Sequence, residues 1–358
     1  SNHRLMKFDA TSGAFEGWVG RANVAPSAGG GQLATCATPP VSGARTPGWC
    51  LGGTSQVSAR RQQSVAGPPA EVAPPDEGFY NPSGVSTDGT YLYVADGNNY
   101  RIARIDLATG AFSGWIGYVY RTSVLAPTAP AQASSTYTTT WTDGGVTGDR
   151  ASNGWGFAYS VIVDTSSSPN YLYIADSYHR VSRVVASNGS DLRWIGRAGA
   201  SPTGGYIGCS STPVGGTNPG WCLNGSGNRY GNTNGTFYSP TGLAMTASKL
   251  FVSDYTNFRI QRFDRTNGTF DGWIGGGNLS ASKWSRTIAG GAKASRSGID
   301  DSSFGDMATA FAGVFMNTNH MFVADPGWHR IKKYNRQDGS FVGYIGQIQN
   351  GGGFYPVG

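Results

Sequence analysis

One pattern of short motifs recurs along this chain, and the repetition is the strongest constraint on its fold. In the clearest copy, Phe79-Tyr-Asn-Pro-Ser-Gly84 precedes Tyr91-Leu-Tyr-Val-Ala-Asp96. Arg101-Ile-Ala-Arg-Ile-Asp106 and Phe112-Ser-Gly-Trp-Ile-Gly117 then follow. Further copies begin near Phe157, Phe237 and Phe311. A unit repeated in this way buries its apolar face against its neighbours.

The two ends of the chain carry incomplete copies of the pattern. Residues 3–20 hold only the second half of a copy, and Phe354-Tyr-Pro-Val-Gly358 holds only an opening. The sequence therefore predicts that the chain begins and stops within a repeat.

Each copy contains four short runs of apolar and β-branched residues separated by Gly, Asn and Asp, and helical periodicity is absent. This pattern predicts a four-stranded antiparallel meander. One slot between the third and fourth strands holds a dipeptide ending in Gly, which suits the positive φ of a tight hairpin turn. These dipeptides are Ser12-Gly13, Thr109-Gly110, Asn188-Gly189, Asn267-Gly268 and Asp338-Gly339.

Repeated four-stranded sheets bury their faces best when they pack radially, as blades of a propeller. The sequence therefore predicts an all-β fold, a β-propeller of four-stranded antiparallel blades. The order Pro-x-Gly, Leu-Tyr-Val-Ala-Asp and Arg-Ile closely resembles the NHL-repeat β-propeller family. That resemblance implies a ring, commonly of six blades, that binds proteins, RNA or other ligands on its faces. Five fourth-strand aromatics indicate five blades here, with six as the alternative.

The spacing of the repeats departs from that family, because a compact blade needs only about 40–45 residues. We expect one propeller over residues 1–358 with long loop insertions between blades. The predicted blades are 1–20 completed by 354–358, 78–117, 154–196, 235–275 and 303–346. The predicted insertions are 21–77, 118–153, 197–234 and 276–302. Loops of this length are usually functional or disordered.

All four cysteines lie in two insertions, as Cys36 with Cys50 and Cys209 with Cys222. The second member of each pair stands in Pro-Gly-Trp-Cys-Leu, so the two loops are copies of each other. The spacing does not match structural zinc knuckles, and local disulfides are the favoured hypothesis. Because disulfides persist in oxidising compartments, we predict an extracellular or cell-surface protein.

Charge and hydropathy exclude two further classes of protein. The net charge of +6 is a mild excess with no Lys/Arg stripe, so we expect no nucleic-acid partner. No apolar run approaches the ~18 residues of a membrane helix, so we expect no membrane span.

Two sets of residues recur once per copy, and we interpret both as scaffold. A carboxylate followed by a guanidinium at a fixed offset would satisfy backbone donors and each other within a blade. These pairs are Asp96 with Arg101, Asp176 with Arg180, Asp254 with Arg259, and Asp325 with Arg330. A fourth-strand aromatic would pack blade against blade. These aromatics are Trp18, Trp115, Trp194, Trp273 and Tyr344.

The insertion tryptophans have no such slot in the strand pattern. Trp49, Trp141, Trp221 and Trp284 are therefore the candidates for partner contact, with packing within the loop as the alternative.

Histidine gives little support to an enzyme. His3, His179 and His329 occupy the slot that holds Tyr100 and Phe258 in other copies, which indicates packing residues. We find no phosphate loop, no nucleophile elbow and no Cys/His pair, and we expect no catalytic residue, no metal and no cofactor.

The favoured hypothesis is a non-enzymatic extracellular adhesion or binding scaffold that presents disulfide-braced loops to a protein or glycan, similar to the repeat proteins that bacteria display on their surfaces. One alternative is a subunit of a surface fibre or filament, which joins other copies of itself through open blade edges. The other is a metal-dependent propeller lyase or lactonase.

Overall fold

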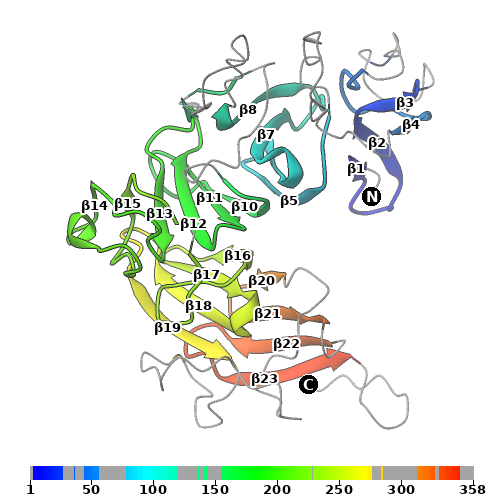
Figure 1. Cartoon of the computed structure of the whole chain (residues 1–358). Helices are drawn as coiled ribbons and strands as arrows, with labels where there is room; N and C mark the ends of the chain where they lie inside the picture. The colour runs from blue at the N-terminus through cyan, green and yellow to red at the C-terminus, as the bar shows by residue number, and fades with distance from the viewer. Residues whose placement is uncertain are drawn as a thin grey trace, which may run out of the picture. The chain divides into compact units, whose positions relative to one another are not determined.

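The four complete copies of the repeat fold as four antiparallel sheets (Figure 1). The computed structural model describes residues 3–26, 36, 44–55, 78–119, 136–137, 140–142, 155–227, 229–275, 284, 313–326 and 330–346. In every sheet the four strands follow one another in chain order. The strands are β5 (Pro82–Thr87), β6 (Tyr91–Asp96), β7 (Arg101–Asp106) and β8 (Phe112–Val119); β10 (Ala158–Asp164), β11 (Tyr171–Asp176), β12 (Arg180–Val185) and β13 (Arg193–Gly196); β16 (Pro240–Met245), β17 (Lys249–Asp254), β18 (Arg259–Asp264) and β19 (Phe270–Gly275); β20 (Val314–Met316), β21 (His320–Asp325), β22 (Arg330–Asn335) and β23 (Phe341–Gly346).

The remaining elements are short. The first half-repeat forms the hairpin of β1 (Arg4–Phe8) and β2 (Phe15–Gly20), and insertion residues add β3 (Ala22–Val24), β4 (Thr54–Ser55), β9 (Thr136–Tyr137), β14 (Gly204–Gly205) and β15 (Cys222–Leu223). Single 3-10 turns are η2 (Gly97–Asn99), η3 (Cys209–Ser211) and η4 (Tyr255–Asn257). The described residues include no α-helix. The predicted fold class, all-β with four-stranded antiparallel blades of the propeller type, is confirmed.

The register of the strands explains the repeated motifs. The second and third strands pair so that the last Asp of one faces the first Arg of the other, as in Asp96 opposite Arg101. The third and fourth strands pair so that this Arg faces the Gly that ends Trp-Ile-Gly. A Cβ atom at Gly275 would lie 2.5 Å from the carbonyl oxygen of Phe258, and its φ is +141°. Only glycine fits there without moving the backbone.

The turn between the third and fourth strands is the same in every repeat. In the second sheet of the chain, Asp106 N donates to Ala111 O and Gly110 N donates to Asp106 O, both at 2.8 Å. Gly110 has a φ of +74°, as the Gly in this slot was predicted to require. The turn is longer than a two-residue hairpin, because the bond from Asp106 N to Ala111 O encloses four residues. The Asp106 carboxylate also accepts from Thr109 N within this turn.

Apolar cores lie between consecutive sheets. One core joins Phe251, Ile260 and Ile274 of β17–β19 to Met321, Val323 and Tyr334 of the last sheet. These residues come from the continuous apolar runs of the second, third and fourth strands. Sheet-against-sheet burial of this kind supplies most of the stability of such a fold.

The chain separates into two compact units. The first comprises Ser1–Tyr171 and Val185–Ser190, and the second comprises Leu172–Val184 and Asp191–Gly358. The division falls within the sheet that holds β10–β13, to which β15 and β14 add a further edge. The opening at 354–358, His329 and much of the predicted insertions lie outside the described residues. The number of blades and the single-propeller organisation stay predictions.

Candidate functional site

Both predicted disulfides are present. Cys36 and Cys50 are bonded with their Cα atoms 5.6 Å apart, and Cys209 and Cys222 with theirs 5.5 Å apart. No cysteine is free. Two disulfides are typical of a protein that folds in an oxidising compartment.

The second cysteine of each disulfide pairs with the fourth strand that precedes its loop. Trp194 of β13 pairs with Cys222 of β15, and Trp194 Nε1 donates to the Asn224 carbonyl at 2.8 Å. Trp18 pairs with Cys50 in the same way, and its Nε1 donates to the Gly52 carbonyl at 2.8 Å. The fourth-strand tryptophan therefore anchors the braced loop, a role that its place in the repeat did not predict.

The other fourth-strand aromatics differ in detail. Trp115 is buried, and its backbone pairs with that of Thr142. Trp273 and Tyr344 are half-buried, and the Arg330 guanidinium lies 4.9 Å from the centre of the Tyr344 ring. The anchoring hydrogen bond is formed by Trp18 and Trp194, and the packing of one blade against the next by the five aromatics stays a prediction.

The insertion tryptophans point into the molecule. Trp49 and Trp221 are buried, and Trp141 and Trp284 are half-buried. Each indole Nε1 donates to a backbone carbonyl of the next third-to-fourth-strand turn. Trp49 and Trp221 therefore have almost no surface for a partner. The packing alternative describes these two residues, because a large apolar ring gains more from burial than from exposure.

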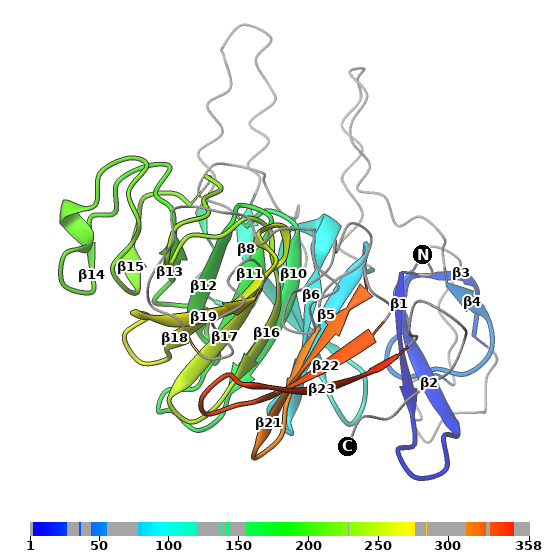
Figure 2. The same ribbon diagram turned by 90° about the horizontal axis from the view of Figure 1, so that it is seen from below.

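Three apolar side chains of the loop after β13 are exposed instead. Ile207 is 82% exposed, Tyr230 60% and Val214 56%. Their backbone is held in place, since Arg197 donates to the carbonyls of Gly215 and Tyr230 at 2.9 and 3.0 Å. Figures 1 and 2 both draw β14 at the outer end of this loop.

The four Asp–Arg pairs form buried ion pairs inside each sheet. The Arg Nε to Asp Oδ2 distances are 2.7 Å for Asp96–Arg101, 2.9 Å for Asp176–Arg180, 2.7 Å for Asp254–Arg259 and 3.4 Å for Asp325–Arg330. Asp96 also accepts from Tyr80 N and from Asn99 Nδ2. Burial raises the pKa of Asp96 to about 7 and lowers the pKa of Arg101 to about 9. The Asp96 carboxylate thus accepts from three partners of its own repeat, Tyr80, Asn99 and Arg101.

Two histidines link one repeat to the opening of the next. His179 Nδ1 accepts from Ser239 N, and His3 Nδ1 accepts from Asn81 N, both at 3.0 Å. Burial lowers the pKa of His179 to about 4, so its ring is neutral at pH 7. This connection was missed in the sequence, where the slot read only as packing.

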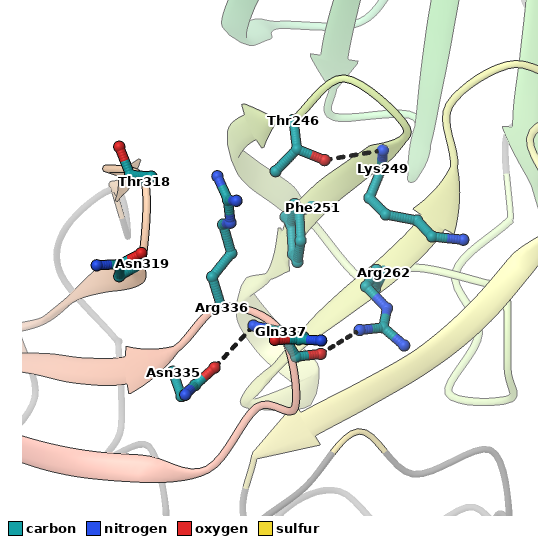
Figure 3. A pocket seen from close by; sticks show the side chains of 9 residues that line it. All are labelled: Thr246, Lys249, Phe251, Arg262, Thr318, Asn319, Asn335, Arg336 and Gln337. Carbon is teal, nitrogen blue, oxygen red and sulfur yellow. Dashed lines mark hydrogen bonds between the residues drawn. The ribbon is translucent and has the colours of Figure 1, made fainter.

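A polar cavity of about 510 Å³ lies in the second unit between the ends of β17–β18 and the turns of the last sheet. Figure 3 shows the Arg336 side chain between Thr318 and Phe251. Lys249 and Arg262 point their charged ends at Asp271, at 3.0 and 2.9 Å. The Arg336 guanidinium donates from Nη1 to the Asn317 carbonyl at 3.2 Å. Hydroxyl and amide side chains line the cavity together with the Arg336 guanidinium. The cavity is therefore suited to a small anionic, hydroxyl-rich ligand.

The described ranges contain no group of three or more His, Cys, Asp or Glu side chains placed to hold a metal ion. Within the same ranges, no helix is long and apolar enough to cross a membrane.

No protein-family profile matches this chain, and no curated protein matches it. Among solved structures, two of AztD from Citrobacter koseri, one of them in the apo form, are similar to it at 10% sequence identity and a TM-score of 0.34. The similar region covers 76% of this chain and 48% of the AztD chain. The chain thus spans about half the length of these neighbours, and a TM-score this low assigns it neither their fold nor their role.

Proposed function

We propose that this protein is a non-enzymatic extracellular binding scaffold of the NHL-repeat type, which holds a partner on its disulfide-braced loops. The observation that carries the proposal is the loop after β13, which exposes Ile207, Val214 and Tyr230 although it is fixed to the sheet. Exposed apolar groups on a rigid backbone favour binding, because little conformational entropy is lost when a partner docks.

The partner that this loop fits is a protein surface, since an isoleucine, a valine and a tyrosine offer apolar area and one hydroxyl. A glycan with a carboxylate is the second candidate, and the Arg336 cavity supports it. Cell-surface or extracellular display is the setting in which two disulfides would persist.

The test is binding of the intact protein to arrays of extracellular proteins and acidic glycans. Ile207→Asp should abolish capture of a protein partner, and Val85→Asp, at a strand residue that is 55% exposed, is the matched control. Arg336→Gln should weaken capture of an acidic glycan only. Equal binding by wild type, Ile207→Asp and Arg336→Gln would contradict the proposal.

Self-assembly into a fibre is a second candidate function, and an exposed apolar residue on the last sheet favours it. Ile345 of β23 is 53% exposed, whereas its counterparts Ile116, Ile195 and Ile274 are buried against neighbours. A second copy could cover this face as a following sheet would. Light scattering after size exclusion should then show association that Ile345→Lys prevents; a concentration-independent monomer would rule it out.

A further inference from the structure

The polar cavity of the second unit lies beside a sheet that lacks two tyrosines of the repeat. In the second strand, Tyr93 and Tyr173 occupy the slot that Phe251 holds in this sheet. Both tyrosines are buried, and the Tyr93 hydroxyl donates to the Asp88 carboxylate at 2.8 Å. The Tyr173 hydroxyl lies 3.5 Å from the Arg265 carbonyl of the following sheet. Phe251 keeps the ring and lacks the hydroxyl, which leaves that space to the cavity.

A second filling side chain is replaced two residues earlier. Tyr91 and Tyr171 occupy the slot of Lys249. The Arg104 guanidinium covers the Tyr91 ring, 4.4 Å from its centre. Lys249 instead extends its ammonium group to Asp271 of its own sheet, at 3.0 Å. The two replacements explain why a cavity of about 510 Å³ lies here. Sites for small molecules have volumes of roughly 300–1,000 Å³.

The lining of the cavity is cationic. It includes Lys249, Arg262 and Arg336, and none of its lining residues is acidic. Asp271 pairs with the first two, at 3.0 and 2.9 Å. In the part of the chain that the structure describes, Arg336 forms no ion pair, and its Nη1 donates to the Asn317 carbonyl. Because a guanidinium has several N–H donors, the same group can also hold a carboxylate through two parallel hydrogen bonds.

Hydroxyl and amide side chains surround this arginine. Figure 3 shows Arg336 with Thr318 and Asn319 on one side and Phe251 on the other. Gln337 adds a further amide to the lining. The three polar side chains are exposed, and each can both donate and accept hydrogen bonds. The hydroxyl groups of a sugar ring need partners of this kind.

We propose that this cavity binds a hexuronic acid, a sugar whose ring carries a carboxylate. The inference rests on the proposed function, because it names the ligand of the acidic-glycan candidate. The Arg336 guanidinium holds the carboxylate, and the exposed hydroxyl and amide groups hold the ring hydroxyls. One cation without a carboxylate partner matches the single charge of a uronic acid, whereas a phosphate ester would bring about two charges.

The probe is methyl β-D-glucuronide, titrated into the intact protein by isothermal titration calorimetry. We expect saturable binding, and about tenfold weaker binding of methyl β-D-glucoside, which has the same ring without the charge. Arg336→Gln should weaken glucuronide binding by a similar factor, because the carboxylate loses its charge-assisted hydrogen bonds. Arg193→Gln removes another half-buried arginine of the same unit and is the matched control, with unchanged affinity.

Free glucuronate, titrated in parallel, distinguishes the two sources of such a sugar. Tighter binding of the methyl glycoside would assign a residue linked in a glycan. Equal or tighter binding of the free acid would assign the free sugar. Both results support a hexuronic acid site.

A second variant refills the cavity. Lys249→Tyr combined with Phe251→Tyr restores the residues that the repeat has at Tyr91 and Tyr93. It should abolish glucuronide binding and keep the circular dichroism spectrum and the unfolding midpoint.

Three outcomes would overturn the proposal. They are no binding of the glucuronide, binding of the glucoside or of glucose 6-sulfate as tight as that of the glucuronide, and equal binding by wild type, Arg336→Gln and the refilled variant. Capture of a protein through Ile207 is measured separately, so a failure there and a failure of this cavity are distinct results.

Discussion

At the scale of single residues, one slot of the repeat holds different side chains on the same backbone conformation. His179 and Phe258 share a slot with left-handed backbone, at φ of +59° and +54°. The imidazole adds a hydrogen bond from Ser239 and edge-on contact with the Tyr238 ring, 5.3 Å away. A polar residue in an aromatic slot therefore acts as a connector as well as a packing group.

We predict that His179 makes stability depend on pH below neutrality. The folded-state pKa of about 4 lies below the value of about 6.5 expected in the unfolded chain, so the unfolded state binds the extra proton. Stability contributed by the neutral ring is present above pH 6.5 and is lost as the pH falls to 4. Protonation would also place a donor on Nδ1 opposite the Ser239 N–H.

Urea unfolding at pH 7 and pH 4.5 measures this effect. The loss assigned to His179 should be about 1–2 kcal/mol, below the full value of the shift because the ring is partly exposed. His179→Phe should remove that part of the pH dependence. The same pH dependence in the variant and the wild type would contradict the assignment.

A second prediction concerns the buried ion pairs. Asp176→Ala leaves the Arg180 guanidinium buried without its carboxylate, which should lower the free energy of unfolding by about 3–5 kcal/mol. Glu16→Ala, which breaks the exposed Lys7–Glu16 pair, is the control and should cost about 0–1 kcal/mol. Thermal unfolding compares the two, and an unchanged midpoint for Asp176→Ala would refute the scaffold role.

At the scale of elements, each described insertion is fastened to regular structure at its tryptophan. The residue after the tryptophan pairs with the fourth strand, as Cys50, Thr142 and Cys222 do with Trp18, Trp115 and Trp194. Long segments with little core of their own thereby gain fixed points at both the strand and the turn.

We predict that the second disulfide stabilises its loop by about 3 kcal/mol, since it closes a segment with a sequence separation of 13. The Cys209→Ser, Cys222→Ser double variant should unfold at lower urea and be cut by protease between these positions. Ser211→Ala is the control within the same loop. Equal midpoints and equal proteolysis would contradict the prediction.

At the scale of the whole molecule, covalent links brace the insertions. Each disulfide closes within a single insertion, Cys36–Cys50 in the first and Cys209–Cys222 in the third. The molecule is thus expected to respond to reductants.

We predict that EDTA leaves the thermal midpoint unchanged within about 1 °C, while dithiothreitol lowers it by several degrees. Scanning fluorimetry of one preparation in both reagents measures this. A drop in EDTA alone would favour the metal-dependent alternative.

Much of the fold could be predicted from the sequence because it depends on local spacing. Short apolar strands, a turn glycine such as Gly110, and an Asp four or five residues before an Arg each follow from neighbours along the chain. The disulfides follow from the same logic, since Cys36 and Cys50, like Cys209 and Cys222, are close in sequence.

Only the tertiary structure decided which side chains face a partner. Trp49 and Trp221 turn inward because a turn of the next repeat accepts their indoles, whereas Ile207 is 82% exposed. Whether a side chain is buried depends on what lies opposite it in space, and short-range patterns carry no record of that.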